Sequence, residues 1–97
     1  MDRSTTLERS AVRFGALADP ARLAILDRLR TGSRCVCELR DDLGMASNLL
    51  SYHLRILRRA GLVTGSRRGR RVEYRALPDA LEAARRELRV LEPEAVR

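Results

Sequence analysis

Residues 34–60 carry the strongest pattern in the sequence, because two short helical periodicities follow one another there with a turn signal between them. In the second periodicity, Leu50, Leu54 and Leu57 have the i, i+4, i+7 spacing of one buried helix face. Gly44 permits a sharp turn between the two. This segment is therefore predicted to form a helix-turn-helix.

The exposed side of the second helix is polar in its N-terminal half. That half is the part of a recognition helix that enters the major groove, where hydroxyl, amide and guanidinium groups bond to bases and phosphates. His53 lies here as well, and we interpret it as a phosphate contact or a packing residue rather than a metal ligand. The candidate DNA-binding residues of this helix are Ser47, Asn48, Ser51, Tyr52, His53 and Arg55.

Residues 62–76 change to the shorter period of β-strands. Two β-prone runs, 62–64 and 71–75, flank a basic segment with two glycines, which is the pattern of a hairpin. Beside a recognition helix, such a tip lies along the adjacent minor groove and contacts phosphates. We therefore predict a β-wing, whose candidate DNA-binding residues are Arg67, Arg68, Arg70 and Arg71.

Two further helices are predicted before the helix-turn-helix, over residues 6–17 and 20–30. Asp19 is a good N-cap for the second of them, and a proline follows at its first helical position. Its predicted buried stripe consists of Leu23, Leu26 and Leu29. With these elements the chain is expected to be mostly α-helical with a small β-hairpin, and to form one winged helix-turn-helix domain over residues 1–97.

A last helix is predicted over residues 78–91. Its apolar residues step by four, three, four and three, which is a heptad-like seam formed by Leu77, Leu81, Ala84, Leu88 and Leu91. We expect the terminal regions 1–18 and 78–97 to pair with those of a second subunit. Such a homodimer would space two recognition helices about 34 Å apart, to match a palindromic operator. The alternative is that the last helix folds back on its own core.

The charge distribution favours a nucleic-acid partner. The chain has 20 basic and 13 acidic residues and a formal net charge of +7. Eight arginines lie between Arg55 and Arg75, opposed only by Glu73. Such a patch is typical of a protein that binds a polyanion such as double-stranded DNA, although a solvated charged surface is the alternative interpretation.

The sequence argues against two other classes of protein. No apolar run approaches the ~20 residues of a membrane span, and the N-terminus lacks the apolar core of a signal peptide, so we expect a cytoplasmic protein with no membrane partner. The glycines fit no dinucleotide or phosphate-binding motif, and the single histidine is on the predicted recognition helix. An enzyme is therefore not expected.

Cys35 and Cys37 are separated by one residue, which we take to be too close for an ordinary structural disulfide. A pair of this kind in a cytosolic protein suggests metal or redox chemistry. Thiolates select soft ions over hard ones. The alternative is an inert pair in which Cys37 is buried as an apolar filler.

Four segments in register resemble the ArsR/SmtB family of winged-helix repressors. The family resemblance rests on LADPARLAILDRL (17–29), CVCEL (35–39), NLLSYHLRILRRAGLV (48–63) and GRRVEYRAL (69–77). The resemblance implies a homodimer that represses transcription and leaves its operator when a metal or metalloid ion binds. It implies no permanent cofactor.

In arsenic-responsive members of that family, the corresponding helix supplies three cysteine thiolates to As(III) or Sb(III). Here Cys35 and Cys37 match the first two, but Arg40 stands at the third position. We therefore expect Cys35 and Cys37 to bind As(III), Sb(III) or another thiophilic ion such as Cd(II) or Zn(II), with water, a nearby carboxylate or an external thiol completing the coordination. The family's other common site needs a histidine in the last helix, which this sequence lacks.

The spacing of the two cysteines suggests how ion binding would act. Residues i and i+2 of an α-helix point about 200° apart, so one ion would hold both sulfurs only if the first helical turn unwound. That distortion would reach the recognition helix. The alternatives are a winged-helix DNA-binding regulator with no metal response and a thiol redox sensor.

Overall fold

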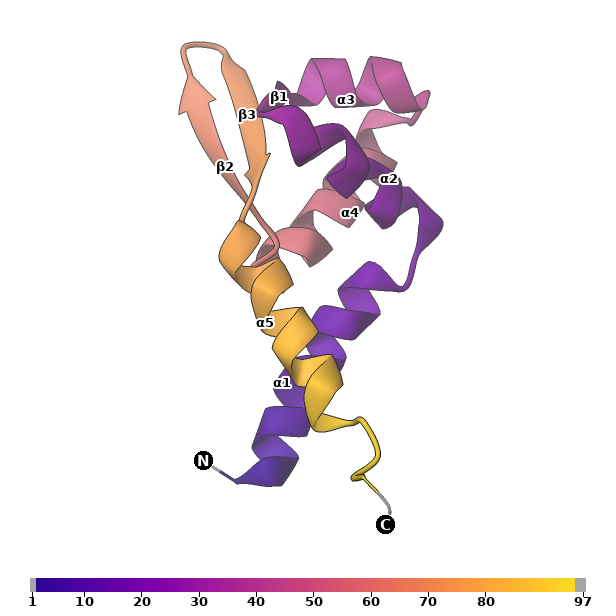
Figure 1. Cartoon of the computed structure of the whole chain (residues 1–97). Coiled ribbons are helices and arrows are strands. Elements are labelled where there is room, and N and C mark those ends of the chain that lie inside the picture. Colours follow the sequence, from indigo (N-terminus) through magenta and orange to yellow (C-terminus); the bar gives the residue numbers. More distant parts are fainter. Residues whose placement is uncertain (1, 96–97) are drawn as a thin grey trace.

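The computed structural model describes residues 2–95, and Figure 1 shows their arrangement. The elements are α1 (Arg3–Leu17), α2 (Pro20–Arg28), the 3-10 turn η1 (Leu29–Thr31), β1 (Arg34–Cys35), α3 (Val36–Leu43), α4 (Ser47–Arg59), β2 (Val63–Arg68), β3 (Arg71–Ala76) and α5 (Pro78–Val90). In Figure 1, the middle elements form a body from which α1 and α5 project together as a stalk. The molecule is accordingly elongated, with principal extents of 57 × 24 × 23 Å.

The helix-turn-helix is formed by α3 and α4. Leu50, Leu54 and Leu57 are at most 2% exposed, which confirms the predicted buried face of α4. Gly44 has φ +59°, a left-handed conformation that ends α3 and turns the chain toward α4. The core beneath these helices is shared with α2, whose Ile25 is fully buried.

The predicted stripe of α2 is partly wrong. Leu26 and Leu29 are buried, but Leu23 is 51% exposed and Ile25 takes its place in the core. The inward face of α2 begins at Arg22 and follows the i, i+3, i+4, i+7 spacing, so Leu23 lies about 100° away from it.

Helix α1 also begins earlier than predicted, at Arg3, because the Asp2 side chain caps it by accepting a hydrogen bond from the Ser4 N–H at 3.3 Å.

The wing is a three-stranded antiparallel sheet in the order β1-β3-β2. Strands β2 and β3 are longer than the predicted runs and meet at a two-residue turn with Gly69 at φ +63°, which suits the first central position of a hairpin turn. The sequence analysis missed β1, in which Arg34 pairs with Tyr74 and Cys35 with Glu73.

The stalk is joined to the body by short connections. Two residues, 18 and 19, separate α1 from α2, and Leu77 alone separates β3 from α5. The Leu77 N–H donates to the Leu62 carbonyl at 2.9 Å, which fixes the start of α5 to the base of the wing. The mostly α-helical fold with a β-wing is thus as predicted, with one strand more than expected.

Candidate nucleic-acid interface and cysteine site

The outer face of α4 presents five of its six candidate residues to solvent. The exposed candidates are Ser47, Asn48, Ser51, Tyr52 and Arg55. Tyr52 is 50% exposed, which leaves its hydroxyl end free to contact a base or phosphate. The N-cap of α4 is Ala46, which forms no side-chain hydrogen bond with the first turn. The first N–H groups of α4 therefore remain available to a phosphate oxygen.

His53 differs from the other candidates because it is only 6% exposed. Its Nδ1 lies 3.1 Å from Nη1 of Arg22, and since a guanidinium only donates, Nδ1 is the acceptor. Its ring also packs edge-on against Tyr52, with the ring centroids 5.2 Å apart. Of the two interpretations offered for His53, the geometry supports packing and positioning rather than a phosphate contact.

Arg22 connects three helices and was missed by the sequence analysis. Its Nε donates to the Ala16 carbonyl at 2.8 Å and its Nη2 to the Gly15 carbonyl at 3.2 Å, at the C-terminal end of α1. Its third contact is to His53 on α4. The only signal in the sequence was an arginine at a position on the inward face of α2. This side chain joins the stalk to the recognition helix.

Asp19 caps α2 at the same junction. Its Oδ1 accepts hydrogen bonds from the Ala21 N–H at 2.8 Å and the Arg22 N–H at 3.2 Å. Desolvation alone would raise the pKa of the Asp19 carboxyl, but these hydrogen bonds and the charge of Arg22 outweigh it, so the pKa is lowered from 3.8.

The four wing arginines are all exposed, and two of them form ion pairs within the protein. Arg68 Nε lies 3.2 Å from Glu73 Oε1, and Arg71 Nη2 lies 3.4 Å from Glu38 Oε1. Within residues 2–95, Arg67 and Arg70 have no ion-pair partner. Arg67 and Arg70 therefore have their full charge available to a phosphate.

Cys35 and Cys37 are joined by a disulfide, with their Cα atoms 5.3 Å apart. The expectation that the two residues are too close for a disulfide is wrong. Cys35 is the N-cap of α3, and its extended backbone (φ −73°, ψ 157°) lies outside the helix, so the 200° separation of helical i and i+2 positions does not apply. Both sulfurs meet without unwinding α3, and that part of the predicted mechanism is also wrong.

The inert-pair interpretation placed Cys37 in the core, but in the structure Cys35 is the buried cysteine. Cys35 is 1% exposed, whereas Cys37 is exposed. Cys35 Sγ accepts a hydrogen bond from the Glu38 N–H at 3.2 Å, and Glu38 Oε1 accepts one from the Cys35 N–H at 3.0 Å. This reciprocal capping box begins α3, so chemistry at Cys35 acts directly on the start of the helix-turn-helix.

A depression of about 360 Å³ brings the cysteine pair against the wing. It is lined by Cys35, Val36, Cys37, Arg40, Arg70, Arg71 and Val72. Three arginines and the exposed Cys37 therefore line the same depression.

A complete metal site is not formed by these residues. Within residues 2–95, no group of three or more histidine, cysteine or acidic side chains is placed to hold a metal ion. The carboxylate of Glu38, which is close in sequence to both cysteines, is engaged with the Cys35 N–H and with Arg71. A thiophilic ion would therefore have to complete its coordination with groups from solvent.

Together, the exposed face of α4 and the basic wing beside it define a winged helix-turn-helix protein. Residues 19–64 match the family described as bacterial regulatory protein, arsR family. The chain belongs to this family, which confirms the resemblance seen in the sequence. This family and the matched relatives are described as transcriptional regulators, in agreement with the prediction made from the sequence.

The similar curated proteins include several that are named repressors. The chain is 55% identical over 60 residues to the HTH-type transcriptional repressor SmtB of Mycobacterium tuberculosis, covering 62% of this chain but only 44% of that protein. It is 40% identical over 68 residues to the arsenical resistance operon repressor of Bacillus subtilis, covering 69% of this chain and 65% of that protein. The match to the SmtB repressor thus spans less than half of that relative's length.

Solved structures extend the similarity over nearly the whole chain. An ArsR-like transcriptional regulator from Rhodococcus superposes with a TM-score of 0.84 at 30% identity, covering 93% of this chain and 83% of that one. A homodimeric winged helix-turn-helix DNA-binding domain from Mycobacterium bovis has a TM-score of 0.78 at 33% identity, covering 94% of this chain and 86% of that one.

None of the helices described over residues 2–95 is both long and apolar enough to cross a membrane.

Proposed function

We propose that this chain is a sequence-specific DNA-binding transcriptional regulator, a repressor that binds a palindromic operator as a homodimer. The observation that carries the proposal is that the polar face of α4 and the arginines of the wing are all exposed. Ser47, Asn48, Ser51, Tyr52 and Arg55 would read the major groove, and Arg67, Arg68, Arg70 and Arg71 would contact phosphates along the adjacent minor groove.

Dimerisation through α1 and α5 is supported by apolar side chains that the monomer leaves in solvent. In α5, Ala84 is buried against the chain's own elements, but Leu81 and Leu88 are 38% and 55% exposed. In α1, Leu7 and Val12 are 39% and 59% exposed. Leu81 and Leu88 are seven residues apart and so lie on one side of α5, as expected of side chains that pack in a protein interface. The homodimeric relative from Mycobacterium bovis supports the assembly of two subunits.

The sensing site that we propose is the Cys35–Cys37 pair. As(III), Sb(III) or another thiophilic ion would bind the two thiolates and take a third ligand from solvent, an inference supported by the name of the arsenical resistance relative. Because Cys35 caps α3 and pairs with Glu73 of β3, a change at its sulfur would alter both the helix-turn-helix and the wing. A coupling of about 1–3 kcal/mol between this site and DNA would suffice for release.

A thiol redox switch is the second candidate, and the disulfide itself favours it. In this reaction the two thiols lose two protons and two electrons to an oxidant such as hydrogen peroxide, and the S–S bond forms. The incomplete metal coordination within residues 2–95 supports this candidate as well. The exposed Cys37 and the surrounding arginines suit attack by a thiolate.

Fluorescence anisotropy of a labelled operator duplex distinguishes the candidates. Fully reduced protein is titrated with As(III), Cd(II) and Zn(II), and separately with hydrogen peroxide followed by excess dithiol. The Cys35→Ser/Cys37→Ser variant is the control. Release by an ion, lost in the variant, supports the ion sensor, whereas release by peroxide that dithiol reverses supports the redox switch.

Under both sensing proposals, the reduced protein without ion or oxidant should bind its operator sequence-specifically. Specific binding that ignores every ion and oxidant would contradict both sensing proposals and leave a DNA-binding regulator. If no duplex is preferred over random DNA by about 10³-fold, the regulator proposal itself is wrong.

A further inference from the structure

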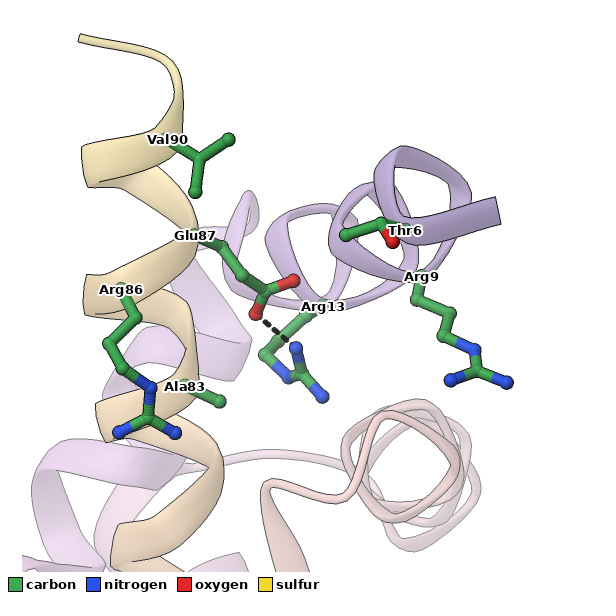
Figure 2. A pocket seen from close by; sticks show the side chains of 7 residues that line it. All are labelled: Thr6, Arg9, Arg13, Ala83, Arg86, Glu87 and Val90. Carbon is green, nitrogen blue, oxygen red and sulfur yellow. Dashed lines mark hydrogen bonds and ion pairs between the residues drawn. The ribbon is translucent and has the colours of Figure 1, made fainter. Parts of the chain in front are cut away.

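We propose that the groove between α1 and α5 binds a small organic anion, a carboxylate with an apolar group. The groove has a volume of about 340 Å³, which is within the range of small-ligand sites. It is lined by Thr6, Arg9, Arg13, Ala83, Arg86, Glu87 and Val90 (Figure 2). This site is separate from the cysteine pair and from the surface proposed to bind DNA.

Three arginines and one carboxylate line this groove, and the carboxylate is already bonded within the protein. Glu87 Oε1 accepts from Arg13 Nη1, and Glu87 Oε2 accepts from the Ser10 hydroxyl. Among the described residues, neither of the other two arginines is paired with Glu87. In Figure 2 the guanidinium group of Arg13 lies between those of Arg9 on α1 and Arg86 on α5.

Arg9 and Arg86 lack a strong carboxylate partner of their own. Within residues 2–95, Arg9 forms no ion pair. The one ion-pair partner of Arg86 among the described residues is Glu82, at 3.9 Å, and Glu82 is also paired with Arg85 at 3.1 Å. The groove thus holds a surplus of positive charge that an anion would neutralise.

Arg13 provides a second, independent indication of a missing acceptor. Its Nε is buried and has no hydrogen-bond partner, the one side-chain atom of this kind among residues 2–95. A buried donor without a partner is costly, so the pairing with Glu87 leaves the Arg13 guanidinium only partly satisfied. Ala83 and Val90 form an apolar wall, which favours a carboxylate with a hydrocarbon part over a bare inorganic anion.

The groove would stay open in a dimer formed through the exposed leucines. Successive residues of an α-helix are turned by about 100°, so Leu88 lies on a different side of α5 from Glu87, and Leu7 on a different side of α1 from Thr6. DNA is an unsuitable occupant, because the residues that line the groove lie on α1 and α5, and none of them belongs to α4 or the wing.

Benzoate is the test probe, with inorganic phosphate and neutral benzamide for comparison. Binding to the reduced full chain is followed by methyl NMR of Ala83 and Val90, without DNA, so the result does not depend on the proposed function. We expect benzoate to shift both methyl signals, more strongly than phosphate, and benzamide to have no effect. The Arg9→Gln/Arg86→Gln variant should bind about tenfold more weakly or worse.

The matched control is Arg89→Gln, which removes the same charge from an exposed position of α5 outside the groove and should bind benzoate like the parent. Circular dichroism checks that each variant is folded, and Arg9→Gln alone replaces the double variant if that one unfolds. Absence of any shift, equal shifts with benzamide, binding of phosphate alone, or unchanged affinity in the groove variant would overturn the proposal. A DNA duplex that shifts the same methyl signals would also overturn it.

Discussion

The role of Arg22 follows from its contacts with α1 and α4 and could not be inferred from its residue type. Leucine positions on a periodic face could be predicted because burial follows from spacing alone. An arginine on the same face could not, because its role depends on carbonyls and a histidine that come from other helices. The buried state of His53 was unpredictable for the same reason.

Replacement of Arg22 by leucine should lower the free energy of unfolding by about 2–3 kcal/mol, since it leaves polar groups of α1 and His53 without a partner. Urea denaturation measures this loss. Arg28→Leu, at an exposed position of the same helix, is the control and should change stability by less than about 0.5 kcal/mol. Equal effects of the two variants would contradict the role given to Arg22.

Asp19 makes stability depend on pH. Because its pKa is lowered from 3.8 in the folded chain, its ionised form contributes stability above pH 3.8, and this contribution is lost as the pH falls through the lowered pKa. Asp19→Asn keeps a capping side chain but removes the titration. The difference in thermal midpoint between parent and variant should therefore shrink as the pH is lowered below 3.8. A constant difference across this pH range would show that the carboxylate charge plays no part.

The helices and the hairpin were largely predictable from sequence, because each has a regular apolar period or a turn residue at its end. Strand β1 was not, since two residues carry no periodicity and its pairing with β3 is a long-range contact. Because β1 was not predicted, Cys35 was assigned to a helix. The predicted separation of the two cysteine side chains was therefore wrong. In the interface, the exposed residues of α4 and the wing arginines were predictable because they lie on the outer side of elements whose inner side is apolar.

Helix α4 depends on its buried leucines. Leu57→Ala removes a fully buried side chain and should destabilise the fold by about 2–5 kcal/mol through lost apolar contact and a cavity. Leu49→Ala on the same helix removes a side chain that is 46% exposed and should cost clearly less. Chemical denaturation of both variants provides the comparison. Similar losses would mean that the assigned face of α4 is incorrect.

The wing and the recognition helix should contribute differently to DNA binding. Arg70→Ala should weaken binding to every duplex and reduce the salt slope by about one unit, as expected for one lost phosphate contact. Ser51→Ala and Tyr52→Ala should instead reduce the preference for the operator over other sequences. Anisotropy titrations over a range of salt concentrations measure both effects. Loss of sequence preference alone in the Arg70 variant would contradict the wing assignment.

For the whole molecule, the stalk should determine the oligomeric state. Leu88→Glu places a charge on the exposed seam of α5 and should shift the protein from dimer to monomer, with a loss of operator affinity of tenfold or more, equivalent to at least about 1.4 kcal/mol. Arg89→Glu, at the next position, is the control for charge and should remain dimeric. Light scattering coupled to size exclusion measures the mass. A dimeric Leu88 variant would place the subunit contact elsewhere.

Because the connections between stalk and body are short, a tilt of the stalk is transmitted to the recognition helix. With two residues before α2, one before α5 and Arg22 fastening the first joint, the stalk cannot swing freely relative to α4. Over a length of 57 Å, a tilt of about 4° moves the far end by about 4 Å, more than the 3.4 Å between successive bases of one strand. A subunit contact that rotates by only a few degrees would therefore put the second recognition helix out of step with its half-site.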